Sequence, residues 1–260
     1  MSPETTTAVN TPTQEVVELI PPTPPSDLIF DDGEPLESNR HRIGMNALIR
    51  SLQQAWKGRN DYFTGGNMFV YYSSAQVKNR DFKGSDFFVV LDIDGSYPRQ
   101  GWVVWDENGR YPDTIVELLS DSTQEVDKGA KKKLYERVFR TPDYFVFDPF
   151  DSNSLQGWHL DSSQNYQPIV PDKRGWLWCE RLGLYLGTWE GEIDKETAVW
   201  LRFYEKEGNL VLLPEEAAVQ RAEQEAQRAE QEAQRAEQEA QRAERLAARL
   251  RELGEDPDLL

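Results

Sequence analysis

The segment TIVELL, residues 114–119, is apolar on both alternations of an extended chain, which is typical of a β-strand covered on both faces. Its one ionisable side chain is that of Glu117. A carboxylate buried on such a strand is costly unless a cation or a hydrogen-bonding partner satisfies it. The segment therefore predicts a sheet strand that carries a charged site. The alternative is an edge strand from which Glu117 points to solvent.

Asp86 begins a second apolar run, which reads DFFVVL over residues 86–91. An acidic residue at this place either caps the start of a strand or shares a site with Glu117. Two carboxylates that lie close together repel each other unless a cation is bound between them. The residue types alone leave both interpretations of Asp86 open.

A helix predicted over residues 125–139 places a base near this pair. Leu134, Tyr135 and Val138 form its apolar face, and Lys131 lies three and four positions before the first two. The stem of Lys131 is therefore expected on the buried stripe, whereas its two neighbours at 132 and 133 fall towards other faces. Such a lysine needs a carboxylate or phosphate within reach. The alternatives are a lysine that extends to solvent, or one paired with Asp127 on the preceding turn.

The remaining periodicity predicts an α/β domain over residues 34–214. Apolar residues at 45, 48, 49, 52 and 56 indicate a helix over about 38–57. We expect a central mixed sheet flanked by helices, with strands near residues 68–72, 87–92, 102–105, 114–119, 144–148, 155–160, 184–188, 200–204 and 210–213.

The two ends of the chain differ from this domain in composition. Residues 1–33 are rich in Pro and Thr, which predicts a disordered arm. The heptad RAEQEAQ occurs three times from Arg221, and good helix formers continue beyond it, which predicts a helix over 215–253 followed by a tail at 254–260. An alanine seam buries little area, so the helix is either solitary or forms a weak coiled coil, for example in a homodimer.

The net charge of −17 is concentrated in these ends. Residues 1–40 hold eight acidic residues against one basic, and residues 215–260 hold thirteen against seven, which leaves −4 for residues 41–214. The acidity therefore weakens a nucleic-acid hypothesis without excluding it. A single cysteine, Cys179, together with the lack of a secretory signal or membrane-spanning stretch, predicts a cytoplasmic protein without disulfides.

Four pieces of sequence in this order resemble the Uma-two family, which belongs to the P-D-(D/E)-x-K nuclease superfamily. They are SDFFVVLD from Ser85, PDTIVELLSDST from Pro112, DKGAKKKLY from Asp127 and PDYFVFDP from Pro142. The resemblance implies that Asp86 and Glu117 bind Mg²⁺ or Mn²⁺ and that Lys131 is the basic residue that orients water or stabilises developing negative charge. It also implies a restriction-endonuclease-like core and DNA as the substrate.

The chain departs from the superfamily pattern at two positions. Leu119 stands where the lysine usually follows the acid by two residues, so the resemblance implies that Lys131 supplies the amine from the next helix. Ser85 stands where proline usually precedes the acid. Some members add a glutamate from the first helix, for which Glu37 is the candidate.

Three hypotheses follow for function. The first is a Mg²⁺-dependent endonuclease that hydrolyses phosphodiester bonds in DNA, with the cation activating water and Lys131 orienting it. The second is a catalytically silent nuclease fold that acts as an interaction module assembled through its C-terminal helix. The third is an unrelated α/β scaffold without a site. The two histidines, His41 and His159, have no second zinc ligand nearby in sequence and are interpreted as structural.

Overall fold

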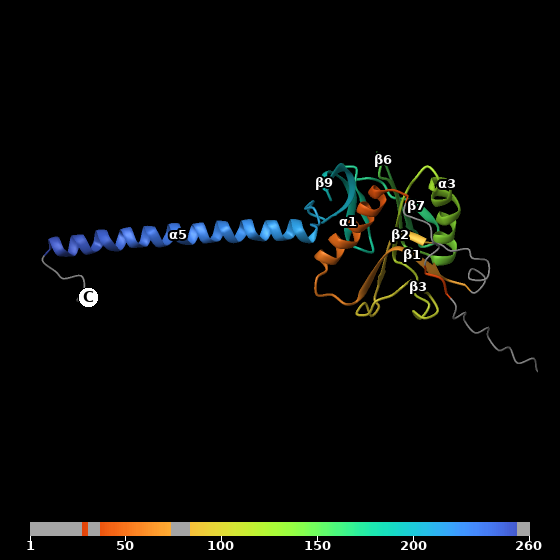
Figure 1. Ribbon diagram of the computed structural model, residues 1–260, viewed down its shortest axis with the longest axis horizontal. Coiled ribbons are helices and arrows are strands. Elements are labelled where there is room, and N and C mark those ends of the chain that lie inside the picture. The colour runs from red at the N-terminus through yellow and green to blue at the C-terminus, as the bar shows by residue number, and fades with distance from the viewer. Residues whose placement is uncertain (1–27, 31–36, 74–83, 254–260) are drawn as a thin grey trace, which may run out of the picture.

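The computed structural model describes residues 28–30, 37–73 and 84–253. It consists of a two-sheet α/β body from which one long helix projects (Figure 1). The larger sheet has seven strands in the order β3-β1-β2-β4-β5-β6-β7. The bounds of these strands are Tyr62–Tyr71 for β1, Gly84–Leu91 for β2, Trp102–Val103 for β3, Thr114–Leu118 for β4, Asp143–Asp148 for β5, Asp151–Leu160 for β6 and Tyr166–Pro168 for β7.

The seven-stranded sheet is mixed. β4 runs parallel to β5, and β1 runs parallel to β3, whereas every other neighbouring pair is antiparallel. β4 therefore lies in the middle of the sheet, between β2 and β5. All five of its residues are buried, as its apolar alternation predicts. The predicted α/β fold with a central mixed sheet flanked by helices is confirmed.

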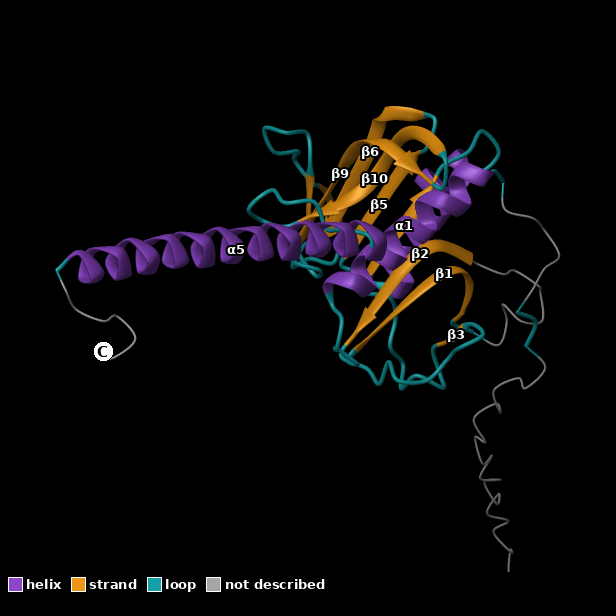
Figure 2. Ribbon diagram, turned by 60° about the vertical axis from the view of Figure 1, so that its left-hand side comes forward, coloured by secondary structure: helices purple, strands orange, loops and turns teal. Residues whose placement is uncertain are grey.

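One face of this sheet is covered by helix α1, Asn39–Ala55, and by a second, three-stranded sheet. The second sheet has the order β10-β9-β8, with bounds Glu196–Tyr204, Leu184–Ile193 and Leu177–Cys179. Figure 2 shows α1 lying beside β1, β2 and β10. Ser38 caps α1 by accepting a hydrogen bond from the His41 backbone N–H. Leu48 and Leu52 then pack fully buried against the sheet.

The opposite face is covered by one irregular helix over residues 124–139. It consists of α3 (Gln124–Val126), η1 (Asp127–Lys131), α4 (Lys132–Leu134) and η2 (Tyr135–Phe139). The backbone N–H groups of Lys132 and Arg140 each donate to the carbonyl five residues earlier, as in a π-helix. This looser winding keeps residues four positions apart on the same side of the helix.

The π-turns change which residues of the 124–139 helix are buried. Val138, expected on the apolar face, is 45% exposed, while Phe139 is buried. In a regular α-helix residue 138 would face inward, but the wider π-turns shift the inward-facing position by one residue, to Phe139. The inward row is therefore Asp127, Lys131, Tyr135 and Phe139.

Several strand boundaries differ from those expected. β1 begins at Tyr62, six residues earlier than predicted, because its first half contains polar residues and two glycines that weaken the strand pattern. β7 and β8 were not predicted, and each has only three residues. The strand expected at 210–213 is reduced to one bridge between Leu210 and Tyr204.

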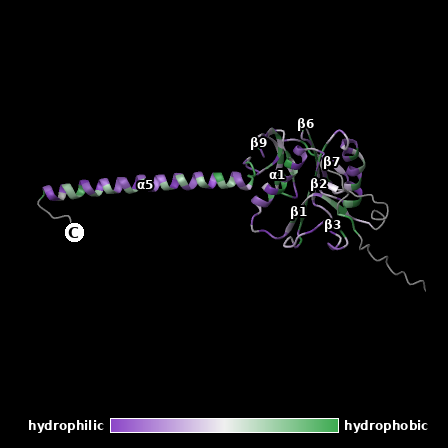
Figure 3. Ribbon diagram, in the orientation of Figure 1, coloured by the Kyte–Doolittle hydropathy of each residue, from purple (hydrophilic) through white to green (hydrophobic). Residues whose placement is uncertain are grey.

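Helix α5, Pro214–Glu252, confirms the predicted C-terminal helix. Figure 3 shows hydrophilic and hydrophobic residues alternating along it. It is fixed at its base, where the fully buried guanidinium of Arg202 pairs with the Glu216 carboxylate at 2.7 Å. Its pairing with another helix stays a prediction. The predicted arm at 1–33, except for residues 28–30, and the predicted tail at 254–260 lie outside the described residues.

Candidate active site

Asp86 and Glu117 lie side by side at the ends of two neighbouring strands. The pairing of Phe87 with Val116 places the next residues, Asp86 and Glu117, opposite one another on β2 and β4. Directly opposed residues of an antiparallel pair point to the same face, which here is the face covered by the 124–139 helix. Glu117 is fully buried and Asp86 is partly exposed. The alternative that Glu117 points to solvent from an edge strand is therefore wrong.

Lys131 reaches this pair from the helix above it. Its Nζ lies 3.3 Å from Oε2 of Glu117 and 2.9 Å from Oδ1 of Asp127. The Lys131 side chain is 17% exposed, whereas both carboxylates are fully buried. The structure thus brings together the three residues predicted from the sequence. The pairing with Asp127, considered as an alternative, is present in addition to the contact with Glu117.

Further hydrogen bonds hold the two strand carboxylates in place. The Tyr135 hydroxyl donates to Oε1 of Glu117 at 2.6 Å, and the Asp86 backbone N–H donates to Oε2 at 3.3 Å. Oδ2 of Asp86 accepts a bond from the Leu118 backbone N–H at 2.7 Å. Ser85, found where the superfamily has proline, places its Oγ 3.2 Å from the Tyr135 hydroxyl. Both carboxylates are thereby oriented before any ligand binds.

The electrostatics of the cluster show an excess of negative charge. Burial raises the pKa of Glu117 to about 8, although the Lys131 ammonium acts in the opposite direction and Asp86 and Asp127 add to the rise. Burial also raises the pKa of Asp86. Desolvation opposes the charge of Lys131, but the three surrounding carboxylates outweigh it and raise the pKa of that ammonium. The single Lys131 ammonium is therefore surrounded by three acidic side chains.

Asp127 and Tyr135 are members of this cluster that the sequence did not identify as site residues. Neither carboxylate oxygen of Asp127 makes a hydrogen bond, although both are buried and Oδ1 lies beside Lys131 Nζ. Asp127 had been considered only as a helical partner of Lys131, and Tyr135 only as a core aromatic residue. Each of them lies four residues from Lys131. In a helix with π-turns, this spacing places all three side chains on one side.

Glu37 occupies a neighbouring pocket of about 380 Å³ rather than the carboxylate pair. It precedes α1, and its Oε2 lies 3.1 Å from Nε2 of His41. The same ring nitrogen lies 3.1 Å from the Leu119 carbonyl oxygen, so His41 links α1 to the end of β4. His159 contacts Asp143 at 2.7 Å. Each histidine therefore has a structural partner, as predicted.

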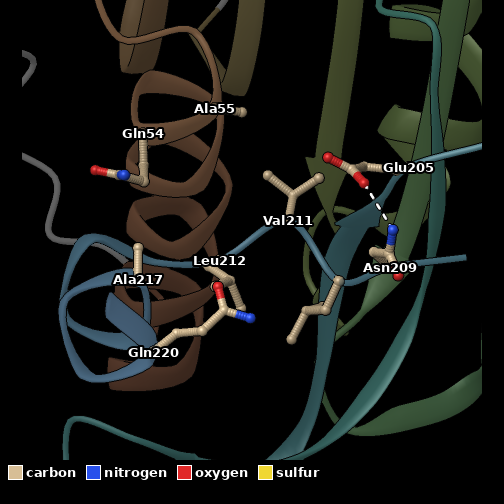
Figure 4. Close-up of a pocket in the computed structure, with 9 residues that line it drawn as sticks. Gln54, Ala55, Glu205, Asn209, Val211, Leu212, Ala217 and Gln220 are labelled. Atoms are coloured by element: carbon tan, nitrogen blue, oxygen red, sulfur yellow. Dashed lines mark hydrogen bonds between the residues drawn. The ribbon is translucent and has the colours of Figure 1, made fainter. Parts of the chain in front are cut away.

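A larger cavity lies elsewhere, at the base of α5 (Figure 4). It measures about 650 Å³ and lies between the end of α1, the end of β10 and the start of α5. Its polar lining includes Gln54, Gln220 and Glu205, whose carboxylate accepts a hydrogen bond from Asn209 at 2.9 Å. This lining lacks the combination of acids and base found near Glu117, so we assign the chemistry to the smaller, buried cluster.

Residues 14–193 match the model of the Uma2 (Uma-two) family, which is described as "Putative restriction endonuclease". The chain belongs to this family. The resemblance drawn from four pieces of sequence is thereby confirmed, and with it the restriction-endonuclease-like character of the fold. Catalytic roles for individual Uma2 residues stay predictions.

A solved structure that resembles this Uma2 chain is a putative nuclease belonging to DUF820 from Anabaena variabilis ATCC 29413. It has 13% sequence identity and a TM-score of 0.40, and the match covers 57% of this chain and 76% of that one. No curated protein matches the chain significantly. Within the described residues, each helix is too short or too polar to cross a membrane.

The donor set fits a divalent cation held by two protein ligands. Among the described residues, no three His, Cys, Asp or Glu side chains converge as a complete metal site. Mg²⁺ commonly takes one or two carboxylates and completes its shell with waters and phosphate oxygens. Asp86 and Glu117 provide those two carboxylates, and the buried excess of negative charge around them favours a cation.

Proposed function

We propose that this Uma2 protein is a metal-dependent endonuclease that hydrolyses phosphodiester bonds in DNA. The observation that carries the proposal is the convergence of two strand carboxylates and one helix lysine on a single face of the sheet. The Lys131 ammonium lies 3.3 Å from the Glu117 carboxylate, which itself is adjacent to Asp86. Two acids and a base placed in this way are the parts that hydrolysis of a phosphodiester requires.

Asp86 and Glu117 would hold the cation, because they offer hard oxygen ligands on one face of the sheet. Mg²⁺ or Mn²⁺ bound there would act as a Lewis acid on a phosphate oxygen and would lower the pKa of a bound water. Tyr135 fixes the orientation of Glu117 through its hydrogen bond at 2.6 Å. This fixed geometry supports catalysis because the ligands do not have to reorganise when the substrate arrives.

Lys131 would contribute a positive charge at the edge of the site. Its partial exposure leaves the ammonium accessible to a water or a phosphate oxygen. The contact with Asp127 at 2.9 Å keeps the side chain extended along the inward row of the helix. From this position Lys131 can orient the attacking water or stabilise the negative charge that develops on phosphate.

The same helix carries exposed basic side chains, which suit a polyanionic substrate. Lys128, Lys133 and Arg137 are exposed on it, within two turns of Lys131. Exposed basic side chains of this kind bind phosphates independently of base sequence. Residues 41–214 carry only −4 of the net charge of −17, so the acidity of the chain opposes DNA binding at this helix only weakly.

The proposal is tested by nicking of supercoiled plasmid in the presence of Mg²⁺ or Mn²⁺. The wild type should convert plasmid to open circles, and Glu117→Gln should lower the rate by about a hundredfold or more. Glu125→Gln is the matched control, since Glu125 is an exposed glutamate on the adjacent helix. Single-stranded RNA serves as a second substrate. Equal rates for wild type and Glu117→Gln would contradict the proposal.

One observation favours the second candidate function, a silent nuclease fold used as an interaction module. Both carboxylate oxygens of Glu117 already have protein partners, namely Tyr135 on Oε1, and Lys131 with the Asp86 N–H on Oε2. A cation must therefore compete with Lys131 for Glu117. If the folded wild type binds neither Mn²⁺ nor plasmid, the silent module is the better description.

A further inference from the structure

Helix α5 presents a regular surface that the proposed nuclease activity does not use. One side of it carries small residues at alternating spacings of four and three, which we name the alanine seam. The seam consists of Ala222, Ala226, Ala229, Ala233, Ala236, Ala240, Ala243 and Ala247. From Ala222 to Ala243 all of these residues are exposed. A seam with this spacing is the contact line of a two-helix coiled coil.

Glutamates flank the alanine seam along both edges. One edge, which we name the first row, consists of Glu223, Glu230, Glu237 and Glu244. The other edge, the second row, consists of Glu225, Glu232 and Glu239. These rows occupy the positions that face a partner helix beside the seam and decide which partner is accepted.

The two rows differ in their neighbours on α5 itself. Each glutamate of the second row has arginines four positions before and three positions after it, such as Arg228 and Arg235 around Glu232. At three and four positions in either direction, the first row has only glutamine, alanine and one valine, Val219. Gln234 donates to Glu230 at 3.3 Å, and Gln241 donates to Glu237 at 3.2 Å. The charge of the first row is therefore not neutralised within the helix.

This arrangement opposes pairing of α5 with a second copy of itself. In a parallel pair, the first row of one helix faces the second row of its partner. In an antiparallel pair, each row faces its own copy. Both arrangements place glutamate against glutamate along the whole seam, which is unfavourable. Alanine side chains bury too little apolar area to offset this repulsion.

We propose that the alanine seam of α5 is a docking surface for a partner helix with small seam residues and lysine or arginine along both edges. Such a helix places a cation opposite each glutamate and approaches closely because alanine leaves the backbone accessible. The first row contributes most to the choice of partner, since no arginine on α5 neutralises its charge. Like charges on the two copies then exclude self-pairing, while opposite charges select the basic partner.

The base of α5 supports this role by holding the seam away from the domain. Glu216 receives two hydrogen bonds from the fully buried Arg202, at 3.1 and 2.7 Å. Arg50 of α1 contacts Glu215 at 2.6 Å. The helix therefore leaves the body in a fixed direction, and the seam projects beyond it (Figure 1). A partner helix can lie along residues 221–247 without contacting the sheets.

The test uses the full chain and labelled peptides that correspond to residues 221–248. In the basic peptide, all seven flanking glutamates are replaced by lysine. A scrambled peptide has the same composition without the seam, and a third peptide keeps the native sequence. We expect fluorescence anisotropy to show the basic peptide binding about tenfold or more tightly than the scrambled one, and binding should weaken with added salt. The native-sequence peptide should not bind.

Variants of the full chain separate the two rows. The triple variant Glu223→Gln, Glu230→Gln, Glu237→Gln should weaken binding of the basic peptide more than the triple variant Glu225→Gln, Glu232→Gln, Glu239→Gln, because arginines already neutralise the second row. Equal binding of the basic and scrambled peptides would overturn the proposal, because it would show that the peptide binds by general charge attraction and not through the seam. Binding of the native-sequence peptide, or a full-length dimer that dissociates when residues 221–260 are removed, would overturn it as well.

Discussion

Glu117 on β4 and Glu230 on α5 are the same residue type in two regions of one chain, and their surroundings differ completely. Glu117 is fully buried, contacts Tyr135 and Lys131, and has a pKa raised to about 8. Glu230 is exposed, and its carboxylate accepts a hydrogen bond from Gln234 on the same helix. The first depends on a few tertiary partners, whereas the second belongs to a repeated local pattern. We therefore expect large effects from single changes at buried pairs and small ones along the exposed repeat of α5.

The largest effect is expected for Lys131→Met. This change leaves the buried carboxylates of Glu117 and Asp127 without their shared cation, which should cost about 3–5 kcal/mol of folding free energy in the absence of metal. Nicking activity should fall by about a hundredfold or more. Urea unfolding and plasmid nicking measure the two effects.

Lys132→Met is the matched control for that change. The Lys132 ammonium lies 3.8 Å from the centre of the Trp158 ring and contacts neither carboxylate of the pair, so about 0.5–1 kcal/mol should be lost. If Lys132→Met abolishes nicking while Lys131→Met does not, the assignment of the lysine is wrong.

The next effect concerns the base of α5. Glu216→Gln removes the anionic partner of the fully buried Arg202 and should cost about 3 kcal/mol or more, which corresponds to roughly 6–12 °C in melting temperature. Glu215→Gln is the control, because Glu215 pairs with the exposed Arg50 and should lose less than about 1 kcal/mol. Equal shifts for the two variants would show that the buried pair does not anchor the helix.

The same pair predicts a pH dependence. Burial opposes the charge of Glu216, but its hydrogen bonds with Arg202 outweigh burial and lower its pKa below the ordinary value of 4.5. The stabilisation is therefore present above about pH 4.5 and is lost as the pH falls through the lowered pKa. The difference in melting temperature between wild type and Glu216→Gln should shrink in acid. A constant difference down to about pH 3 would contradict this reasoning.

A smaller effect, of opposite sign, is expected for Glu117→Gln without metal. The folded-state pKa of about 8 lies above the ordinary value of 4.5, so the wild type loses stability as the pH rises between these values. At pH 7 the folded state must keep a proton on Glu117 that the unfolded state releases. Glu117→Gln needs no such proton, so it should raise metal-free stability by about 1–3 kcal/mol and flatten this slope. Lys131 keeps Asp127 as its partner in the variant. A melting curve at pH 5 and pH 8 measures both changes.

The same variants test metal binding. Mn²⁺ at about ten times its dissociation constant should stabilise the wild type by about 1.4 kcal/mol, or roughly 2–4 °C. Asp86→Asn and Glu117→Gln should abolish this shift, because each removes one of two proposed ligands. An unchanged metal response in both variants would contradict the proposed metal site, and with it the proposed nuclease function.

The smallest effect is expected for removal of residues 221–260. Residues 221–246 are exposed along α5, so their loss removes helix but almost no packing. The helical circular-dichroism signal should fall sharply, and the melting temperature should change by less than about 2 °C. Removal from residue 215 instead deletes Glu216 as well and should behave like Glu216→Gln. A large shift from the shorter deletion would mean that the repeat packs on the body.

Much of the fold could be predicted because it depends on local periodicity. The apolar alternation of residues 114–119 identified β4, and the spacing of apolar residues identified α1. Lys131 could be placed towards Glu117 by its position on one helical face. β7 and β8 could not be predicted, since three-residue strands carry too little pattern to be distinguished from loops.

Helix α5 follows from local sequence alone, because its charges and alanines act on neighbours three and four positions away along one helix. The local patterns were also enough to expect an acid-bearing central strand close to a helix with an inward lysine. In contrast, the burial of Asp127, the hydrogen bond from Tyr135 to Glu117 and the contact of Arg202 at the base of α5 depend on the three-dimensional packing. These contacts join residues on different elements, or depend on π-turns, so their energies arise from packing and desolvation that no local pattern records.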